Sequence, residues 1–162
     1  MFTMIYYKTK AYYSVVFMLN NKIIWINIYQ DDFTKAFKAF NSVISTIKYN
    51  YQTSSTSEQI KFSQIYLEFF EKTIDLFKYY FNHNNLLLLD DTRLIVIYTL
   101  KCNILQEGRL LYELYLAMKK LKNSNKIIPY KYITNNYIDI FEQINIFFEE
   151  KLKQESDNAF LS

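Results

Sequence analysis

The sequence predicts an all-α fold, a compact bundle of five to seven helices. Apolar side chains recur at steps of three and four residues along most of the chain, which is the pattern of helices with one buried face. Of the 162 residues, 51% are hydrophobic, so a single domain can bury a core without disulfides or metal. The chain has one glycine, whereas an all-β fold needs more of them for its tight turns.

Residues 12–29 are the ambiguous part of this pattern. The segments 12–19 and 22–29 are rich in β-branched and aromatic residues. Between them stands Asn20-Asn21, a two-residue turn signal, so a β-hairpin over 12–29 is predicted. A pair of short helices is the alternative.

A helix is predicted to begin at Asp32 and to end in the polar stretch 50–57. Asp31 or Asp32 is available as its N-cap, and the Ser- and Thr-rich stretch 50–57 is the best linker in the chain. Its apolar residues are Phe33, Ala36, Phe37, Phe40, Ile44 and Ile47.

The following helix, 57–81, is apolar on almost every side. Ser55 stands three residues before Glu58, the spacing of a capping box at its start. Since the polar residues form one narrow strip, the helix must be covered on two sides, by its own domain or by a partner. The strip consists of Lys61, Gln64, Glu68, Glu71, Asp75 and Lys78.

The segment 94–105 is predicted to be the apolar central helix of the bundle. Asp90-Asp91 precedes it as a cap, and Gly108 is placed to end it. A buried strand is the runner-up, because Ile95-Val96-Ile97 favours a sheet.

Two amphipathic helices and a loop at 123–129 complete the predicted fold. We expect one helical domain over 1–153, followed by a frayed tail, 154–162. The apolar stripes of the two helices are Leu111, Leu114, Tyr115, Met118 and Leu121, then Tyr137, Ile140, Phe141, Ile144, Phe148 and Leu152.

The residue counts exclude several kinds of site. One Cys rules out a disulfide framework and a Cys-based zinc site, and one Gly rules out a glycine-rich phosphate loop. Cys102 is expected to be a buried, inert thiol, and His83 an exposed loop residue. Two of the three acidic pairs precede helices, and we interpret these two as helix caps. We therefore expect no enzyme activity, no metal site and no cofactor. The pairs are Asp31-Asp32, Asp90-Asp91 and Glu149-Glu150.

Charge and hydropathy argue against nucleic acid and against the membrane interior as partners of this chain. The net charge is +3, and the largest basic cluster, Lys119, Lys120 and Lys122, is expected to be a solvated helix face, so nucleic acid is not the expected partner. No run of about 20 apolar residues predicts a membrane span. The lone Cys suggests a reducing, cytoplasmic compartment. The residues that A/T-rich codons encode are abundant, which suggests an A/T-rich genome, that of a virus, a reduced parasite, an organelle or a plasmid.

The stretch 32–40 resembles the second half of a tetratricopeptide-type repeat, with Phe33, Ala36 and Phe40 at its hydrophobic positions. Residues 106–122 are similar to a second helix-turn-helix of this kind. The resemblance implies helices that pack in pairs.

The chain also resembles the poxviral proteins with the B-cell-lymphoma-two-like fold, helical bundles of similar length around one apolar central helix. Residues 94–105 look like that helix, and Gln106-Glu107-Gly108-Arg109 keeps the Gly-Arg pair of the family's Asn-Trp-Gly-Arg motif. Residues 144–152 are similar to the last helix of vaccinia-type members. The resemblance implies inhibition of host signalling through surface contacts, with Arg109 pairing with an Asp of an incoming helix.

The sequence therefore predicts a non-catalytic helical protein-interaction module that binds a partner's amphipathic helix. Inhibition of host signalling or apoptosis is the role that the viral resemblance implies. The alternative is a structural subunit of a larger protein or ribonucleoprotein assembly, and a homodimer stays open. The candidate partner-binding residues are Phe70, Phe77 and Phe81, provided that they escape the core, together with Arg109.

Overall fold

The computed structural model describes residues 16–47, 49–85, 90–123 and 127–160, and all regular elements among them are helices, which confirms the all-α prediction. Residues 16–27 form the first described helix. The other elements are the π-helix η1 (Ile28–Phe33), α2 (Thr34–Ile47), α3 (Thr56–Asn85), α4 (Thr92–Lys101), α5 (Gly108–Lys122), the 3-10 turn η2 (Tyr130–Ile133) and α6 (Asn135–Phe160).

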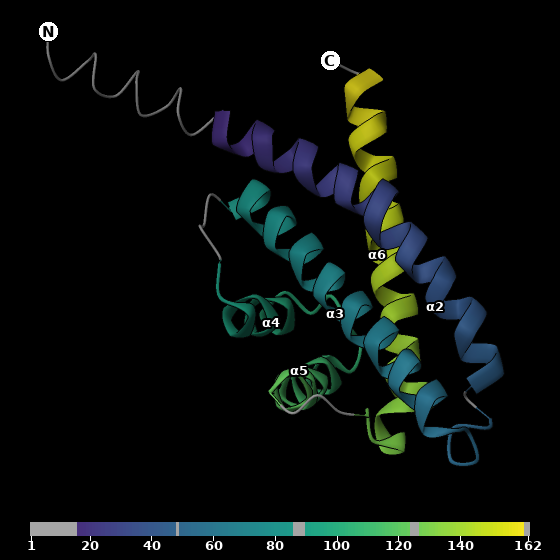
Figure 1. Ribbon diagram of the computed structural model, residues 1–162. Coiled ribbons are helices and arrows are strands. Elements are labelled where there is room, and N and C mark those ends of the chain that lie inside the picture. Colours follow the sequence, from purple (N-terminus) through teal and green to yellow (C-terminus); the bar gives the residue numbers. More distant parts are fainter. Residues whose placement is uncertain (1–15, 48, 86–89, 124–126, 161–162) are drawn as a thin grey trace, which may run out of the picture.

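The three longest described helices, 16–47, α3 and α6, pack together at the centre of the molecule (Figure 1). Residues 16–27 continue through η1 into α2 without a break, and we call this 16–47 stretch the long helix. The ring contacts Trp25–Tyr80 and Phe33–Phe69 show that α3 runs antiparallel to it. α6 runs in the same general direction as α3, and its C-terminal end lies beside the first half of the long helix (Figure 1).

Aromatic rings fill the space among these three helices. Phe40, Phe69 and Phe141 come one from each helix, and all three are buried. Their ring centroids are 4.9 Å apart for Phe40–Phe69, 4.7 Å for Phe69–Phe141 and 5.5 Å for Phe40–Phe141. These separations lie in the range that aromatic pairs prefer, so the triad joins the helices by ring packing as well as by area buried.

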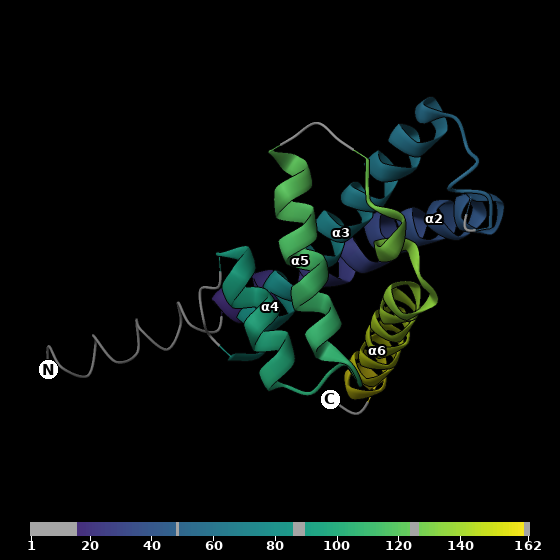
Figure 2. The same cartoon turned by 90° about the horizontal axis from the view of Figure 1, so that it is seen from below.

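α4 and α5 cover the side of α3 that faces away from the long helix (Figure 1). α4 packs against both α3 and α5, and α5 packs against α6. Seen from below, α4 and α5 lie side by side (Figure 2). α3 is therefore enclosed on several sides, as its mostly apolar surface requires.

The segment 94–105 is not the central helix. α4 ends at Lys101, and Leu94 is 52% exposed. A ten-residue helix offers one short buried face, whereas α3 and α6 bring long aromatic runs that fill the centre. The cap prediction is confirmed, because the Asp91 side chain accepts a hydrogen bond from the Leu94 N–H at 3.0 Å. The buried residues of α4 are Ile95, Val96 and Thr99.

Gly108 begins α5 and does not end the preceding helix. Just after α4, Asn103 has a φ of 50°, in the left-handed region, and its N–H donates to the Leu100 carbonyl at 3.2 Å. Asn tolerates this conformation better than most residues do, because its short polar side chain can hydrogen-bond locally. Asn103 therefore has the role at the end of α4 that was predicted for Gly108.

The predicted hairpin over 12–29 is wrong for residues 16–29, which are helical, and residues 12–15 lie outside the described part. Asn20 and Asn21 stand inside the long helix, where Asn21 donates to the Phe17 carbonyl one turn earlier at 2.8 Å. Neither a turn nor a break between two short helices occurs there. The reason is a buried stripe at four-residue spacing, whose packing outweighs the β propensity of the residues between. The stripe is Asn21, Trp25, Tyr29 and Phe33.

A pair of substitutions distinguishes a helix from a hairpin at this position. We expect Asn21→Gly to be less stable than Asn21→Ala by about 1 kcal/mol, because Gly is the poorer helix former by that amount. Both variants lose the same side-chain hydrogen bond, so the difference between them isolates the backbone. Urea unfolding of the two proteins measures it. A hairpin would give the opposite order, since Asn-Gly is a favoured two-residue turn.

Asp31 and Asp32 are not helix caps. They lie in η1, inside the long helix, so no helix N-terminus exists there for them to cap. Asp31 instead lies 3.7 Å from the amine of Lys35, and Asp32 lies 3.6 Å from that of Lys72 on α3.

The start of α3 confirms the capping box. The Ser55 N–H donates to the Glu58 carboxylate at 2.8 Å, and the Ser55 hydroxyl accepts from the Glu58 N–H at 3.3 Å. The hydrogen bonds that the Ser55 hydroxyl and N–H donate to the carboxylate lower the pKa of Glu58, because they stabilise its charged form. The predicted polar strip of α3 is exposed or half-buried at all six positions.

α6 extends to Phe160, so the tail predicted to be frayed is helical over 154–160, and residues 161–162 lie outside the described part. Glu155 joins this end to the other central helices. Its carboxylate pairs with Lys22 and lies 3.8 Å from Nε2 of His83. The other ring nitrogen of His83 lies 2.8 Å from the Met18 carbonyl oxygen. His83 is therefore a contact among three helices, not an exposed loop residue.

Candidate functional site

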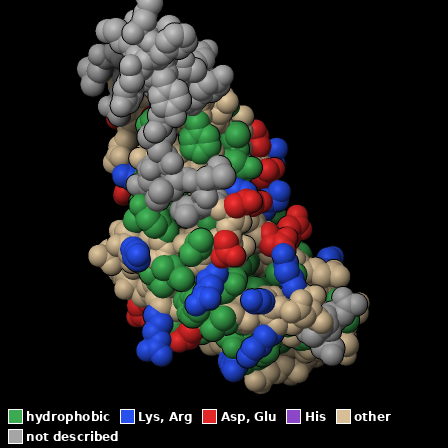
Figure 3. All heavy atoms as spheres, turned by 90° about the vertical axis from the view of Figure 1, so that its left-hand side faces the viewer, with side chains coloured by type: hydrophobic (Ala, Val, Ile, Leu, Met, Phe, Trp, Pro, Cys, Tyr) green, Lys and Arg blue, Asp and Glu red, His purple; other side chains and the backbone are tan. Residues whose placement is uncertain are grey.

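A groove of about 570 Å³ lies between α3 and α5 and is bordered by the start of α4. Each of the two helices contributes residues at steps of three and four, so each turns one face toward the groove. Seen from the side of α4 and α5, apolar side chains are interspersed with acidic and basic ones (Figure 3). The lining residues are Leu67, Phe70, Glu71, Ile74 and Asp75; Asp90, Asp91 and Thr92; and Tyr115, Met118, Lys119 and Lys122.

The floor of the groove is apolar. Phe70, Ile74 and Met118 are buried, whereas Leu67 and Tyr115 are half-buried. The buried side chains are held by core packing, and the half-buried ones leave apolar surface in contact with water. Covering that surface would be favourable by about 25 cal/mol per Å². The floor therefore offers a preformed contact for an apolar group.

Two ion pairs stand beside the floor. Lys122 Nζ lies 2.5 Å from Glu71 Oε1 and so links α5 to α3. Lys78 pairs with Asp90 and links α3 to the residues before α4, and this hydrogen bond raises the pKa of Lys78. Both pairs therefore join α3 to another segment that lines the groove.

Asp75 has no ion pair of its own among the described residues. Lys72 and Lys78, on the same helix, pair with Asp32 and Asp90. The Asp75 carboxyl reaches solvent at the edge of the groove, yet the surrounding helices crowd it, and this burial raises its pKa above the usual value. The lysines oppose the rise, and neighbouring carboxylates add to it.

Lys119 is the matching group on the other wall. It is exposed on α5, and no ion pair to it occurs within the described part of the chain. The groove thus presents an acid on its α3 wall and a base on its α5 wall, with an apolar floor between them.

Of the predicted partner-binding residues on α3, only Phe70 reaches the groove. Phe77 and Phe81 are core residues, so the condition that they escape the core is not met. The Phe77 ring packs 5.1 Å from that of Phe148 on α6, and the Phe81 ring packs 4.8 Å from that of Tyr98 on α4. The helix's own domain supplies the cover that its apolar surface requires.

Arg109 does not line the groove. It stands in the first turn of α5 with its side chain 90% exposed, and its Nε lies 3.2 Å from the Glu113 carboxylate, one turn later. An exposed i,i+4 pair of this kind contributes little to the free energy of unfolding, so the Arg109 side chain is not needed to stabilise the fold.

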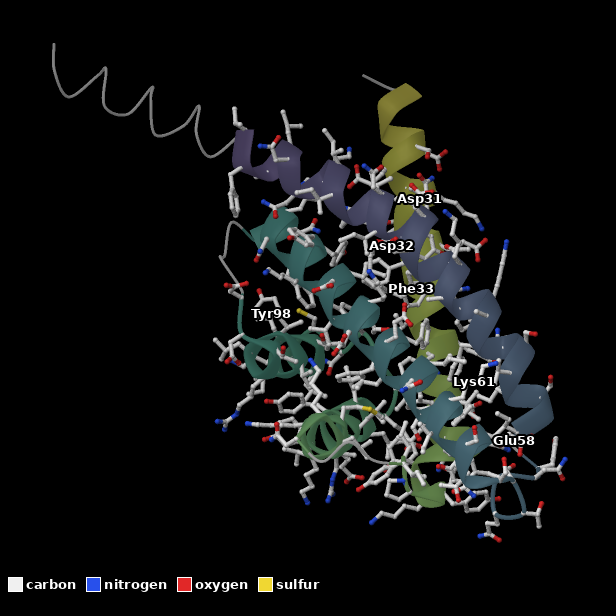
Figure 4. The ribbon with its side chains drawn as sticks, in the orientation of Figure 1. Asp31, Asp32, Phe33, Glu58, Lys61 and Tyr98 are labelled. Atoms are coloured by element: carbon white, nitrogen blue, oxygen red, sulfur yellow. The ribbon has the colours of Figure 1, made fainter. Side chains whose placement is uncertain are left out.

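The three acidic pairs stand on separate elements. Asp31 and Asp32 lie on the long helix (Figure 4), Asp90 and Asp91 precede α4, and Glu149 and Glu150 lie on α6. Cys102 is exposed, not buried as predicted, because α4 lies at the surface and ends one residue before it. Within the described ranges, no three His, Cys, Asp or Glu side chains gather as a metal site.

The sequence did not predict the groove, because the charged residues of each wall fit the ordinary pattern of an exposed helix face. Glu71 and Asp75 belong to the solvated strip of α3, and Lys119 and Lys122 to the basic last turn of α5. The available signal was that both helices carry charge beside an apolar face, acidic on one and basic on the other. Which faces meet depends on the packing of α4 against both helices, and no spacing in the sequence reports that.

No family model, no curated protein and no solved structure matches this chain. In the part of the chain that the structure describes, no helix combines the length and the apolar character needed to cross a membrane.

Proposed function

We propose that the protein is a non-catalytic interaction module whose groove between α3 and α5 binds an amphipathic helix of a partner protein. The single observation behind this is the apolar floor flanked by unlike charges. On α3 the groove runs from Leu67 to Asp75, which is about 12 Å of helix, or a little over two turns. A partner helix that crosses it would present an apolar stripe at the same three- and four-residue spacing.

The expected mode of binding follows from the exposure of the floor. The buried floor residues give the groove a fixed shape, and a large apolar side chain of the partner covers Leu67 and Tyr115. Most of the affinity of such contacts comes from a few central anchors that exclude water. Polar neighbours of the anchor then meet the charged walls, which fixes the orientation of the partner helix.

Binding of a designed peptide tests the proposal. The probe is a fluorescein-labelled helical peptide of about 15 residues, with a leucine stripe flanked by Lys on one side and Glu on the other. Fluorescence anisotropy should show saturable binding of this peptide to the native protein. Leu67→Gln should weaken binding about tenfold, because the partner's anchor loses an apolar contact.

Leu116→Gln is the matched control. Leu116 is an exposed leucine on α5 that does not line the groove, so the same substitution there should change the affinity by less than about twofold. Equal losses in both variants, or no saturable binding to the native protein, would contradict the proposal.

A second candidate, a subunit of a larger assembly, is favoured by a different observation. Leu19 and Ile23 lie one turn apart on the long helix and are 53% and 58% exposed. Gentle size fractionation of the protein in lysate of its own host separates the two. A mass near that of one or two chains supports the groove module, whereas a peak of hundreds of kilodaltons supports the assembly.

The resemblance to the poxviral proteins suggests a biological role for the proposed groove module. A protein of the poxviral kind would act by occupying a helix of a host signalling protein and so preventing that helix from reaching its normal partner. We place this action in the reducing cytoplasm, where the single cysteine stays a free thiol.

A further inference from the structure

Three ion pairs join α3 to its neighbouring segments, and the carboxylate of Asp75 stands among them without a cation from the described part of the chain. Asp32 pairs with Lys72, Glu71 with Lys122, and Asp90 with Lys78. Asp75 lies among these groups, and the charges of several of them act on its carboxyl. In the described structure, however, no cation is paired with it. The two lysines whose charges act on it, Lys72 and Lys78, already have carboxylate partners.

The surroundings of Asp75 make an incoming cation favourable. The carboxyl is partly desolvated by the neighbouring helices. Lys72 and Lys78 are the charges that act on it most, but each is paired with another carboxylate, and the nearby acids Glu71 and Asp32 add negative charge. A carboxylate in such a place interacts more strongly with a cation than one in open water, because the effective dielectric constant is lower. It also has less hydration left to lose on binding. The Asp75 carboxylate therefore stands at the edge of the apolar floor without a paired cation among the described residues, and a cation of the partner can form an ion pair with it.

We propose that Asp75 selects partner helices that carry a lysine or arginine beside their apolar stripe, with which it forms an ion pair across the groove. This inference rests on the proposed function, since it names the chemistry of the helix that the groove binds. Asp75 would set specificity and orientation more than total affinity, because interfacial charge pairs act mainly in that way. A helix with an acid at the same position would be rejected, since it would place like charges together.

A double-mutant cycle between protein and peptide tests this. The probes are leucine-stripe peptides with a single lysine placed in turn at each flank position, and the same peptides with Lys→Gln. For one register of the lysine, Lys→Gln should weaken binding to the native protein about tenfold. The same change should have little effect on binding to the Asp75→Asn variant, because the partner of the lysine is then absent.

Two further variants complete the design. Asp139→Asn, an exposed aspartate on α6 that does not line the groove, should behave like the native protein. Asp75→Lys should reverse the preference and bind a peptide with Glu in place of the lysine more tightly than the lysine peptide. Because Asp75 reaches solvent, neither substitution at this position is expected to unfold the protein.

The outcomes separate this inference from the proposed function. If the stripe peptides bind and depend on Leu67, but no lysine position depends on Asp75, the groove stands and the role of Asp75 is refuted. If no peptide binds at all, both fail. Concentration-dependent dimerisation that Asp75→Asn abolishes would show that a second copy of the chain occupies the groove, and would also overturn the inference.

Discussion

Phe141→Ala is expected to destabilise the protein by about 3–5 kcal/mol, a large part of the total stability of a domain of this size. The ring is fully buried at the point where the three central helices meet. It packs edge-on against Phe40, Tyr66 and Phe69, with centroids 4.7–5.5 Å away. Truncation to Ala leaves a cavity that these rings cannot fill without leaving their own positions, since each is also buried.

Urea unfolding followed by far-ultraviolet circular dichroism measures the effect. Ile146→Ala, on the same helix, is the control: its side chain is 54% exposed, so the loss should stay within about 0.5 kcal/mol. A similar loss for both variants would mean that α6 is not packed into a common core in the way described.

Trp25→Ala is expected to cost about 3 kcal/mol or more, because the indole is fully buried between the long helix, α3 and α6. Its ring lies 5.7 Å from that of Tyr80 and 6.1 Å from that of Phe148. One feature reduces the loss: the indole N–H has no hydrogen-bond partner among the described residues, and removing a buried unpaired donor is favourable.

Trp25→Phe separates these contributions. It keeps an aromatic ring and removes the unpaired N–H, so it should cost clearly less than Trp25→Ala. Differential scanning calorimetry of both variants gives the comparison. Trp25 is the only tryptophan, so in the native protein its fluorescence should also report the same single transition as the circular dichroism. An earlier fluorescence transition would show that the long helix unfolds separately.

The sequence predicted those parts of the fold that local patterns decide. The Ser55–Glu58 capping box, the Asp91 cap and the polar strip of α3 all depend on residues within one or two turns, and all are confirmed. The apolar stripe of the last helix is confirmed as well, since Ile140, Phe141, Ile144 and Phe148 are buried.

The wrong predictions concern segments whose structure depends on packing against residues that are far away in the sequence. Residues 16–29 have β propensity, yet they are helical because Trp25 and Tyr29 find partners on α3 and α6. The segment 94–105 is the most apolar, but length matters more than hydropathy for the central position, and the longer α3 and α6 occupy it. The helical end of α6 depends on a charged contact between Glu155 and Lys22, two residues that are more than a hundred positions apart.

The candidate site was predictable only in part. An apolar excess on α3 pointed to a contact surface there, and Phe70 does lie in the groove. The other two phenylalanines are covered by α4 and α6, and the apolar excess alone could not separate covered rings from a groove floor. Asp75 looked like one more residue of a solvated strip, because its lack of a cation shows only once the partners of its neighbouring lysines are known.

Amide chemical shifts of the ¹⁵N-labelled protein, recorded during titration with the leucine-stripe peptide, test the central claim most directly. If the groove is the binding site, the largest shifts will fall within 67–75 on α3 and 115–122 on α5, with smaller ones at 90–92. Shifts centred on Leu19 and Ile23 of the long helix, with the groove residues unchanged, would contradict the account and place the contact surface on the long helix.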